Sequence, residues 1–303
     1  MVKIFFYTVL FGQIFNLSAP AAVLKIPKHS NAIYEIDDRR LVDSKSSVNV
    51  RTLSESIAMI ISSDSVEKKF LSSRIFAGLL KNSERLNFCS GGKFAEHHSL
   101  NACTGFLVGV DLLATAGHCF ASESDCMNKS VVFNVLAKNE VAEGYKVPVR
   151  NTYGCKEIVS RVIDVDRNID YAVIRLDRKA SGREVLKLRS NGRVGSGDKV
   201  FMIGHPLGLP QVVTNSASLL DNSQPHFFKA ALDSFEGNSG SPVFNSSTLE
   251  VEGILVRGEE DFLLDQSLQC YRDQIYNPGE DESSGSRGEG VSRISDILPS
   301  LYP

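Results

Sequence analysis

The sequence has no tryptophan, no low-complexity repeat and no excess of basic residues, since 33 Lys and Arg are balanced by 36 Asp and Glu. A nucleic-acid-binding surface is usually basic, so this balance disfavours a nucleic-acid partner. The cysteines include no Cys-x-x-Cys pair, and the only paired histidines, His97 and His98, are adjacent. These spacings disfavour a zinc site, and we expect no metal or other cofactor.

Long apolar runs are absent except at the start of the chain. There, a positive residue precedes an apolar stretch from Ile4 to Leu17, and small residues follow up to Ala21. This order predicts a signal peptide at residues 1–21. A membrane anchor is disfavoured because polar residues interrupt the stretch. We therefore predict a secreted or periplasmic protein that has no membrane contact once the signal is removed.

Short apolar runs separated by polar turns fill most of the remaining chain, which indicates an all-β barrel or sandwich. Strands are predicted at Ile57–Ile61, Cys103–Val108, Leu112–Ala116, Val131–Leu136, Lys146–Val149, Ile158–Val165, Tyr171–Leu176, Lys199–Ile203, Val212–Ser216, Phe227–Ala231, Pro242–Phe244 and Val251–Val256. One helix is predicted at Val66–Leu80, and a short closing helix at Ile294–Leu301.

At 303 residues the chain is long enough for two packed β-barrels. We place the first at residues 51–178 and the second at residues 195–303, joined by a polar linker. Residues 22–50 form an N-terminal arm or a short pro-segment. The polar segment 259–287 is predicted to be a surface insertion within the second barrel.

The strongest chemical signal is Gly237-Asn238-Ser239-Gly240-Ser241-Pro242. Small residues allow a tight turn that can aim the amides of Gly237 and Ser239 at one point, as an oxyanion hole requires. A serine hydroxyl needs this stabilisation and a base to become a nucleophile. An ordinary Ser/Gly turn is the alternative interpretation.

Two further motifs supply the base and its carboxylate. His118 follows an apolar strand in Thr115-Ala116-Gly117-His118-Cys119, and histidine takes and returns protons near neutral pH. Asp170 directly precedes the apolar run Tyr171–Leu176, where a carboxylate can orient an imidazole. The nearby Asp164, Asp166 and Asp177 flank polar turns and are weaker candidates.

The order His118, Asp170, Ser239 along the chain differs from the orders of α/β-hydrolases and subtilisin-like enzymes. With these motifs, the sequence resembles the trypsin/chymotrypsin superfamily, and within it the bacterial branch that includes the glutamyl endopeptidases. The segments Ile33-Tyr34 with Asp37-Asp38-Arg39, Gly253–Gly258 and Gly290–Ile294 are also similar to parts of that family.

The resemblance implies a chymotrypsin-like fold of two six-stranded antiparallel β-barrels with a short C-terminal helix. It also implies a secreted serine endopeptidase that forms an acyl-enzyme with protein or peptide substrates, with His118, Asp170 and Ser239 as its triad. A catalytically silent binding protein of the same fold is the alternative function. An esterase of unrelated fold is disfavoured by the chain order.

An even number of cysteines in an exported chain indicates disulfides. The alternative is that some of the cysteines are buried free thiols. The resemblance implies a disulfide between Cys103 and Cys119. The other four cysteines allow three pairings, of which we predict Cys126 with Cys155 and Cys89 with Cys270.

The resemblance places Asp233 and Ser234 at the base of a specificity pocket, and Gly258 and Gly290 on its open wall. A buried carboxylate there would favour Arg or Lys substrates. The alternative is that Asp233 turns away and binds the backbone. Asn238 stands where the animal digestive members carry an aspartate, and a neutral amide cannot form their ion pair with a freed N-terminal amine.

Overall fold

The computed structural model describes residues 33, 34, 36–76, 81–276 and 288–301, so the predicted signal peptide lies outside the described residues. Within them, no helix is long and apolar enough to cross a membrane. Strands dominate the fold, and the helices α1 (Val48–Ser54), α2 (Asn82–Arg85) and α3 (Glu123–Asn128) are short. The all-β prediction is therefore confirmed.

The first barrel is closed by six antiparallel strands in the order β11-β12-β7-β6-β3-β8. These are β3 (Ile57–Ser62), β6 (Cys103–Leu107), β7 (Leu112–Thr115), β8 (Lys129–Phe133), β11 (Thr152–Asp164) and β12 (Ile169–Leu176). Seven of the eight β12 residues are buried, which explains its continuous apolar run. Both site motifs of this barrel therefore lie at the ends of core strands.

The second barrel also contains six strands, because β15 pairs with both β16 and β13 and so closes the ring β13-β15-β16-β22-β18-β17. They are β13 (Lys199–Gly204), β15 (Ala217–Asp221), β16 (Phe227–Ala230), β17 (Pro242–Asn245), β18 (Val251–Arg257) and β22 (Glu289–Arg293). The strand predictions did not include β15 and β22. The two strands β14 (Val212–Val213) and β2 (Arg40–Leu41) extend the sheet from β13.

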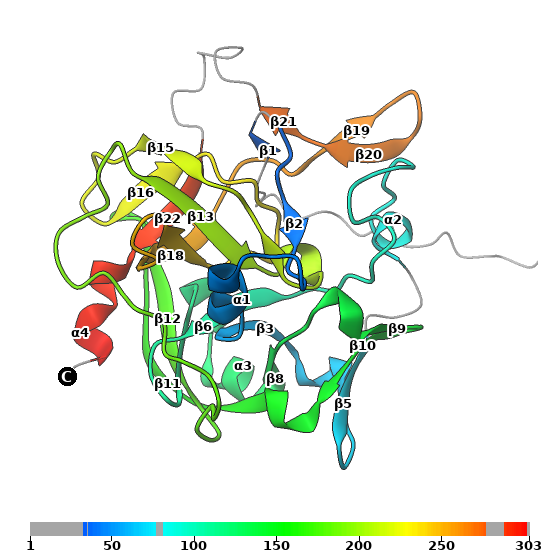
Figure 1. Cartoon of the computed structure of the whole chain (residues 1–303), viewed down its shortest axis with the longest axis horizontal. Coiled ribbons are helices and arrows are strands. Elements are labelled where there is room, and N and C mark those ends of the chain that lie inside the picture. Colours follow the sequence, from blue (N-terminus) through cyan, green and yellow to red (C-terminus); the bar gives the residue numbers. More distant parts are fainter. Residues whose placement is uncertain (1–32, 35, 77–80, 277–287, 302–303) are drawn as a thin grey trace, which may run out of the picture.

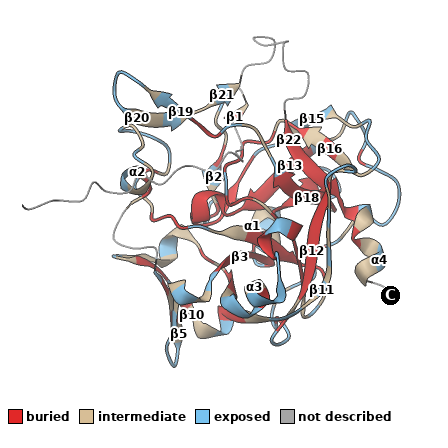
Figure 2. Cartoon of the chain, turned by 180° about the vertical axis from the view of Figure 1, so that it is seen from behind, coloured by how far each residue is buried: buried red, intermediate tan, exposed pale blue. Residues whose placement is uncertain are grey.

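One buried apolar cluster extends across both barrels. A cluster that contains Phe106 and Ile174 of the first barrel continues to Phe244 and Ile254 of the second. Figure 2 shows buried residues concentrated in β12, β13, β18 and β22. The barrels are therefore packed as one unit, and a site formed by loops from both can be held rigidly.

The helix predicted at Val66–Leu80 is wrong. Its described part forms the hairpin β4 (Val66–Lys68) and β5 (Ser72–Phe76), and β5 pairs with β10 (Gly144–Pro148). Ser73 and Ile75 are buried in alternation, and this period of two decides for a strand. The strand predicted at Lys146–Val149 belongs to this outer sheet, which β9 (Glu140–Val141) completes, and not to the barrel.

The closing helix is shorter than predicted. Residues 294–296 form the 3-10 turn η6, and only α4 (Leu298–Leu301) is α-helical. The last helix, α4, contacts the first barrel, where the Tyr171 and Ser300 hydroxyls lie 3.3 Å apart.

The insertion between β18 and β22 carries the hairpin β19 (Phe262–Asp265) and β20 (Cys270–Asp273), followed by β21 (Ile275–Tyr276). The arm strand β1 (Ile33–Tyr34) pairs in parallel with β21. Figure 1 shows both features outside the second barrel. The Cys89–Cys270 disulfide ties the insertion to the segment that follows α2. Cys103–Cys119 and Cys126–Cys155 are the other disulfides, so the three predicted pairings are confirmed.

The disulfides give the first prediction. Cys89 and Cys270 are 181 residues apart, whereas Cys126 and Cys155 are 29 apart. If closing the unfolded chain dominates, replacing the long-range pair by serines should cost about 1.5 kcal/mol more unfolding free energy than replacing the short-range pair. Urea titration of the two double variants measures this difference. Equal costs would contradict the prediction.

Candidate active site

His118 and Asp170 are in direct contact. His118 lies in the 3-10 turn η2 (Gly117–Cys119) just after β7, and Asp170 is near the start of β12, the neighbouring strand. The Asp170 carboxylate accepts a hydrogen bond from the His118 backbone amide at 3.1 Å and lies 2.8 Å from ring atom Nδ1. Asp170 is 5% exposed. A buried carboxylate at Nδ1 fixes a proton there and leaves Nε2 to act as a base.

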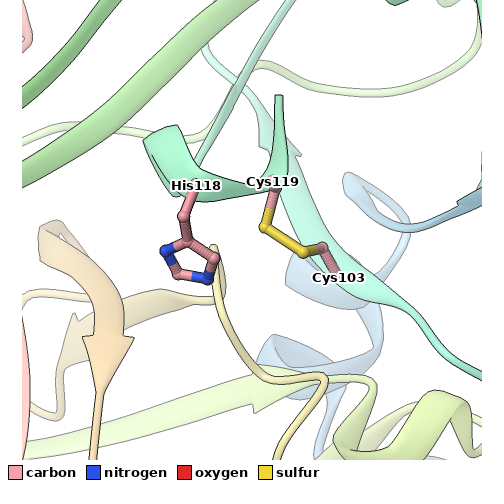
Figure 3. A group of neighbouring side chains, drawn as sticks. All are labelled: Cys103, His118 and Cys119. Carbon is pink, nitrogen blue, oxygen red and sulfur yellow. A yellow bond between two sulfur atoms is a disulfide. The ribbon is translucent and has the colours of Figure 1, made fainter. Parts of the chain in front are cut away.

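Two contacts hold the histidine turn in place, and a glycine allows its close approach to Asp170. The Cys103–Cys119 disulfide ties the turn to β6, as Figure 3 shows beside the His118 ring. Arg161 donates from Nε to the Gly117 carbonyl at 2.8 Å. A Cβ atom at Gly117 would lie 2.9 Å from Asp170 Oδ1, so only glycine permits this approach. The sulfurs of Cys103 and Cys119 gather near His118, but in a disulfide they offer no thiolate to a metal.

The Ser239 loop comes from the second barrel and is fixed to the first. The Ser239 carbonyl accepts a hydrogen bond from the Thr104 amide at 2.8 Å and lies 3.8 Å from Cys119 Sγ. Gly240 has φ +92°, and a Cβ there would lie 2.0 Å from the Thr104 carbonyl. The loop therefore passes directly beside the histidine turn. Among the described residues, the Ser239 hydroxyl forms no hydrogen bond with the His118 ring.

The turn before Ser239 has two amides with no partner. In the described part of the chain, the N–H groups of Gly237 and Ser239 donate to no acceptor. Gly237 has φ +96°, and a Cβ there would lie 2.7 Å from the His205 carbonyl. Its own carbonyl accepts from Thr104 Oγ1 at 3.0 Å. The backbone is thus turned so that these amides are free to bind an external oxygen.

His205 has a structural position under this loop. Its ring is fully buried, and Nδ1 donates to the Leu209 carbonyl at 2.9 Å. Its backbone amide donates to Thr104 Oγ1 at 3.0 Å. Desolvation lowers the pKa of His205 to about 4, so the ring is neutral at physiological pH.

The side-chain amide of Asn238 forms its hydrogen bonds inside the loop. Its side chain is buried and donates from Nδ2 to Ser234 Oγ at 3.0 Å, and its Oδ1 lies 3.5 Å from the Ser241 hydroxyl. The two side-chain groups are thus both used by neutral neighbours.

The predicted pocket residues separate into two groups. Gly258 and Gly290 line one cavity of about 280 Å³, together with Asn168, Lys229 and Arg257. Asp233 and Ser234 do not line it. Asp233 is 4% exposed, and its two oxygens accept the amides of Tyr34 at 2.8 Å and Asp38 at 2.9 Å. The alternative interpretation, in which Asp233 binds backbone, is the one observed.

Sequence reasoning missed the residues that position the site from a distance. Thr104 and Thr115 form a buried relay, in which Thr115 Oγ1 donates to the Thr104 carbonyl at 2.6 Å. Ser292 in β22 accepts the Asp170 amide at 3.2 Å and so joins the carboxylate to the second barrel. Threonine and serine are common in strands, and no local pattern marks these three.

Two closed antiparallel barrels with a histidine, a carboxylate and a serine loop between them define a chymotrypsin-like protein. The chain belongs to the trypsin-like peptidase family, because the model of the trypsin-like peptidase domain matches residues 103–254. A solved Glu endopeptidase in complex with MPD is similar in fold, with TM-score 0.54 and 16% identity, covering 89% of this chain and 97% of that one. The VesB protease of Vibrio cholerae is similar with TM-score 0.50 and 14% identity, covering 86% and 67%. The predicted family and fold are confirmed.

A curated relative is the secreted RxLR effector protein 73 of Plasmopara viticola, which is 28% identical over 157 residues. The match covers 48% of this chain and 38% of the relative, so the chain spans well under half of that protein.

Gly117 gives the second prediction. Its replacement by alanine should lower the unfolding free energy by about 1–3 kcal/mol, because the new methyl group would lie within 2.9 Å of the Tyr171 and Val162 carbonyls and of the Asp170 carboxylate. Thermal or urea unfolding measures the loss. Gly197→Ala is the matched control, since a Cβ there meets nothing within 4 Å. An unchanged Gly117→Ala protein would show that the close approach carries no strain.

His205 gives a prediction on pH. Its folded pKa is depressed from 6.5 to about 4, so its contribution to stability is present above pH 6.5 and is lost as the pH falls towards 4. The loss should reach about 3 kcal/mol. His205→Asn keeps a donor for the Leu209 carbonyl but cannot ionise, so its stability should fall less over this range. Denaturant titrations between pH 7 and 4 test this, and parallel curves for both proteins would contradict it.

Proposed function

We propose that the protein is a serine endopeptidase that hydrolyses protein or peptide substrates through an acyl-enzyme. The observation that carries this proposal is the convergence of His118, paired with Asp170, and the Ser239 loop, pinned to Thr104, at one place between the barrels. Membership of the trypsin-like peptidase family supports it.

In the proposed reaction Ser239 Oγ attacks the substrate carbonyl, and its proton passes to His118 Nε2. Asp170 holds the ring by Nδ1 and stabilises the positive charge that forms. The free amides of Gly237 and Ser239 bind the oxyanion. His118 then gives the proton to the leaving amine, and water cleaves the ester with the same histidine as base. The proposed reaction requires the Ser239 hydroxyl to come within hydrogen-bond distance of Nε2.

Three disulfides and the secreted relative support a protein that acts outside the cell. The predicted preference for Arg or Lys required the Asp233 carboxylate to face the substrate side chain. Both of its oxygens already accept backbone amides, and this geometry disfavours the preference.

A fluorophosphonate probe tests the proposal, since it labels a serine only where a base activates it. We expect stoichiometric labelling of the folded protein and none of Ser239→Ala. Asp170→Asn should slow peptide hydrolysis by roughly 10⁴-fold, the loss found when this carboxylate is neutralised in the trypsin class.

Ser246→Ala is the matched control, because Ser246 is half-buried and, among the described residues, its hydroxyl bonds only to the Ser216 hydroxyl, at 3.0 Å. It should label like the wild type. A folded wild-type protein that takes up no probe would favour the catalytically silent binding protein instead.

A further inference from the structure

The N-terminal arm (residues 33–41) reaches the loop that carries the oxyanion amides. Its backbone supplies the two N–H groups that bind Asp233, at 2.8 and 2.9 Å from Tyr34 and Asp38. Asp233 begins the segment Asp233–Gly237, which leads directly to the nucleophile. The arm amides thus bind both oxygens of this carboxylate and orient it towards the arm backbone.

Arg39 is the second contact between the arm and this loop. It is 0% exposed, and its guanidinium lies 3.8 Å from the centre of the Phe235 ring. Asp37 accepts two hydrogen bonds from it, at 2.9 and 2.8 Å, and Asp273 of the insertion accepts one at 3.1 Å. A buried cation stacked on an aromatic ring and paired with two carboxylates fixes that ring in one place. Phe235 precedes Gly237 by two residues.

The insertion also contacts this loop. Asp261 is buried and accepts the Glu236 amide at 3.0 Å. The Phe262 ring packs on Phe235, with ring centres 4.7 Å apart, in a cluster that includes Ile33 of the arm. The arm and the insertion therefore hold Phe235 and Glu236 between them.

The residue before the nucleophile carries no charge. Asn238 is neutral and bonds to Ser234, so the loop has no buried carboxylate next to the nucleophile to capture an amine. The described charge contacts that order the loop come from Asp233 and Arg39 instead.

We propose that Asp233 and Arg39 are positioning residues that hold the loop Asp233–Gly237 in its active form through the arm, and that Asp233 does not bind the substrate side chain. This inference rests on the peptidase activity proposed above. Burial raises the pKa of Asp233 to about 6, and the two arm amides oppose this effect, which agrees with a charged acceptor held by the arm at neutral pH.

Two measurements distinguish a positioning role of Asp233 from direct binding of the substrate side chain. The first is the rate of labelling by a small fluorophosphonate probe, which carries no side chain for the pocket but needs the oxyanion amides. The second is kcat and KM on matched chromogenic peptides ending in Arg, Lys, Glu or Phe. Asp233→Asn should slow labelling roughly 10- to 100-fold and lower kcat by a similar factor for all four peptides. The ratio of kcat/KM between the Arg and Phe peptides should stay within about twofold of the wild-type ratio.

Arg39→Ala should show the same uniform loss, and Arg39→Lys, which keeps a cation over Phe235, should recover part of it. If Asp233→Asn does not fold, Arg39→Lys can be tested in its place. Labelling of Arg39→Lys that is slower than labelling of the wild type would support the role of the arm. Arg40→Ala is the matched control: Arg40 is exposed, its guanidinium donates to Asn215 at 2.6 Å, and its loss should leave both rates unchanged.

If Asp233→Asn is labelled at the normal rate but loses kcat/KM only on the Arg and Lys peptides, the proposal is overturned. Asp233 would then bind the substrate side chain at the bottom of the pocket. Normal labelling of folded Arg39→Ala would also overturn the proposal. If the wild-type protein is not labelled, the proposed peptidase function itself is contradicted. The failure of that function and the failure of the positioning proposal are therefore distinguishable.

Discussion

The hydrogen bond from the Thr104 amide to the Ser239 carbonyl joins the two barrels at the site. Thr104 lies in β6, which pairs with β7, and β7 leads into the His118 turn. The same threonine binds the Gly237 carbonyl and the His205 amide through its hydroxyl. One strand of the first barrel therefore sets the position of both the serine loop and the turn beneath it. Any shift between the barrels would have to break these bonds, which are buried and costly to lose.

The position of the Asp170 carboxylate also depends on the packing of the two barrels. Burying a charge costs free energy unless donors satisfy it, and two donors come from His118 alone. The Asp170 backbone amide donates to Ser292 in the second barrel, so the carboxylate is held where the two barrels meet. Gly117 allows the backbone to come this close. The contact between His118 and Asp170 thus depends on strand pairing, on a glycine and on the packing of the two barrels.

The sequence was sufficient for the parts of this structure that are encoded locally. Strand periodicity predicted an all-β fold, and the resemblance carried by the site motifs predicted two barrels. The motifs around His118 and Asp170 marked two residues that the fold brings into contact. It failed where partners distant in sequence decide the outcome. The segment from Val66 became a hairpin because β10 pairs with it, and no helical periodicity within it could reveal that partner. The role of Asp233 was open for the same reason, since its partners lie 195 and 199 residues away.

The charge on Asp233 is not explained by stability. Its pKa is raised from 3.8 to about 6, so the folded state is favoured by protonation, and the ionised group costs about 3 kcal/mol at neutral pH. A neutral asparagine would avoid most of this cost but would offer one acceptor oxygen to two converging amides. The carboxylate offers two, one for Tyr34 and one for Asp38. An aspartate at this position therefore favours a single arrangement of the arm at the expense of stability, as expected where a loop must keep one shape during a reaction.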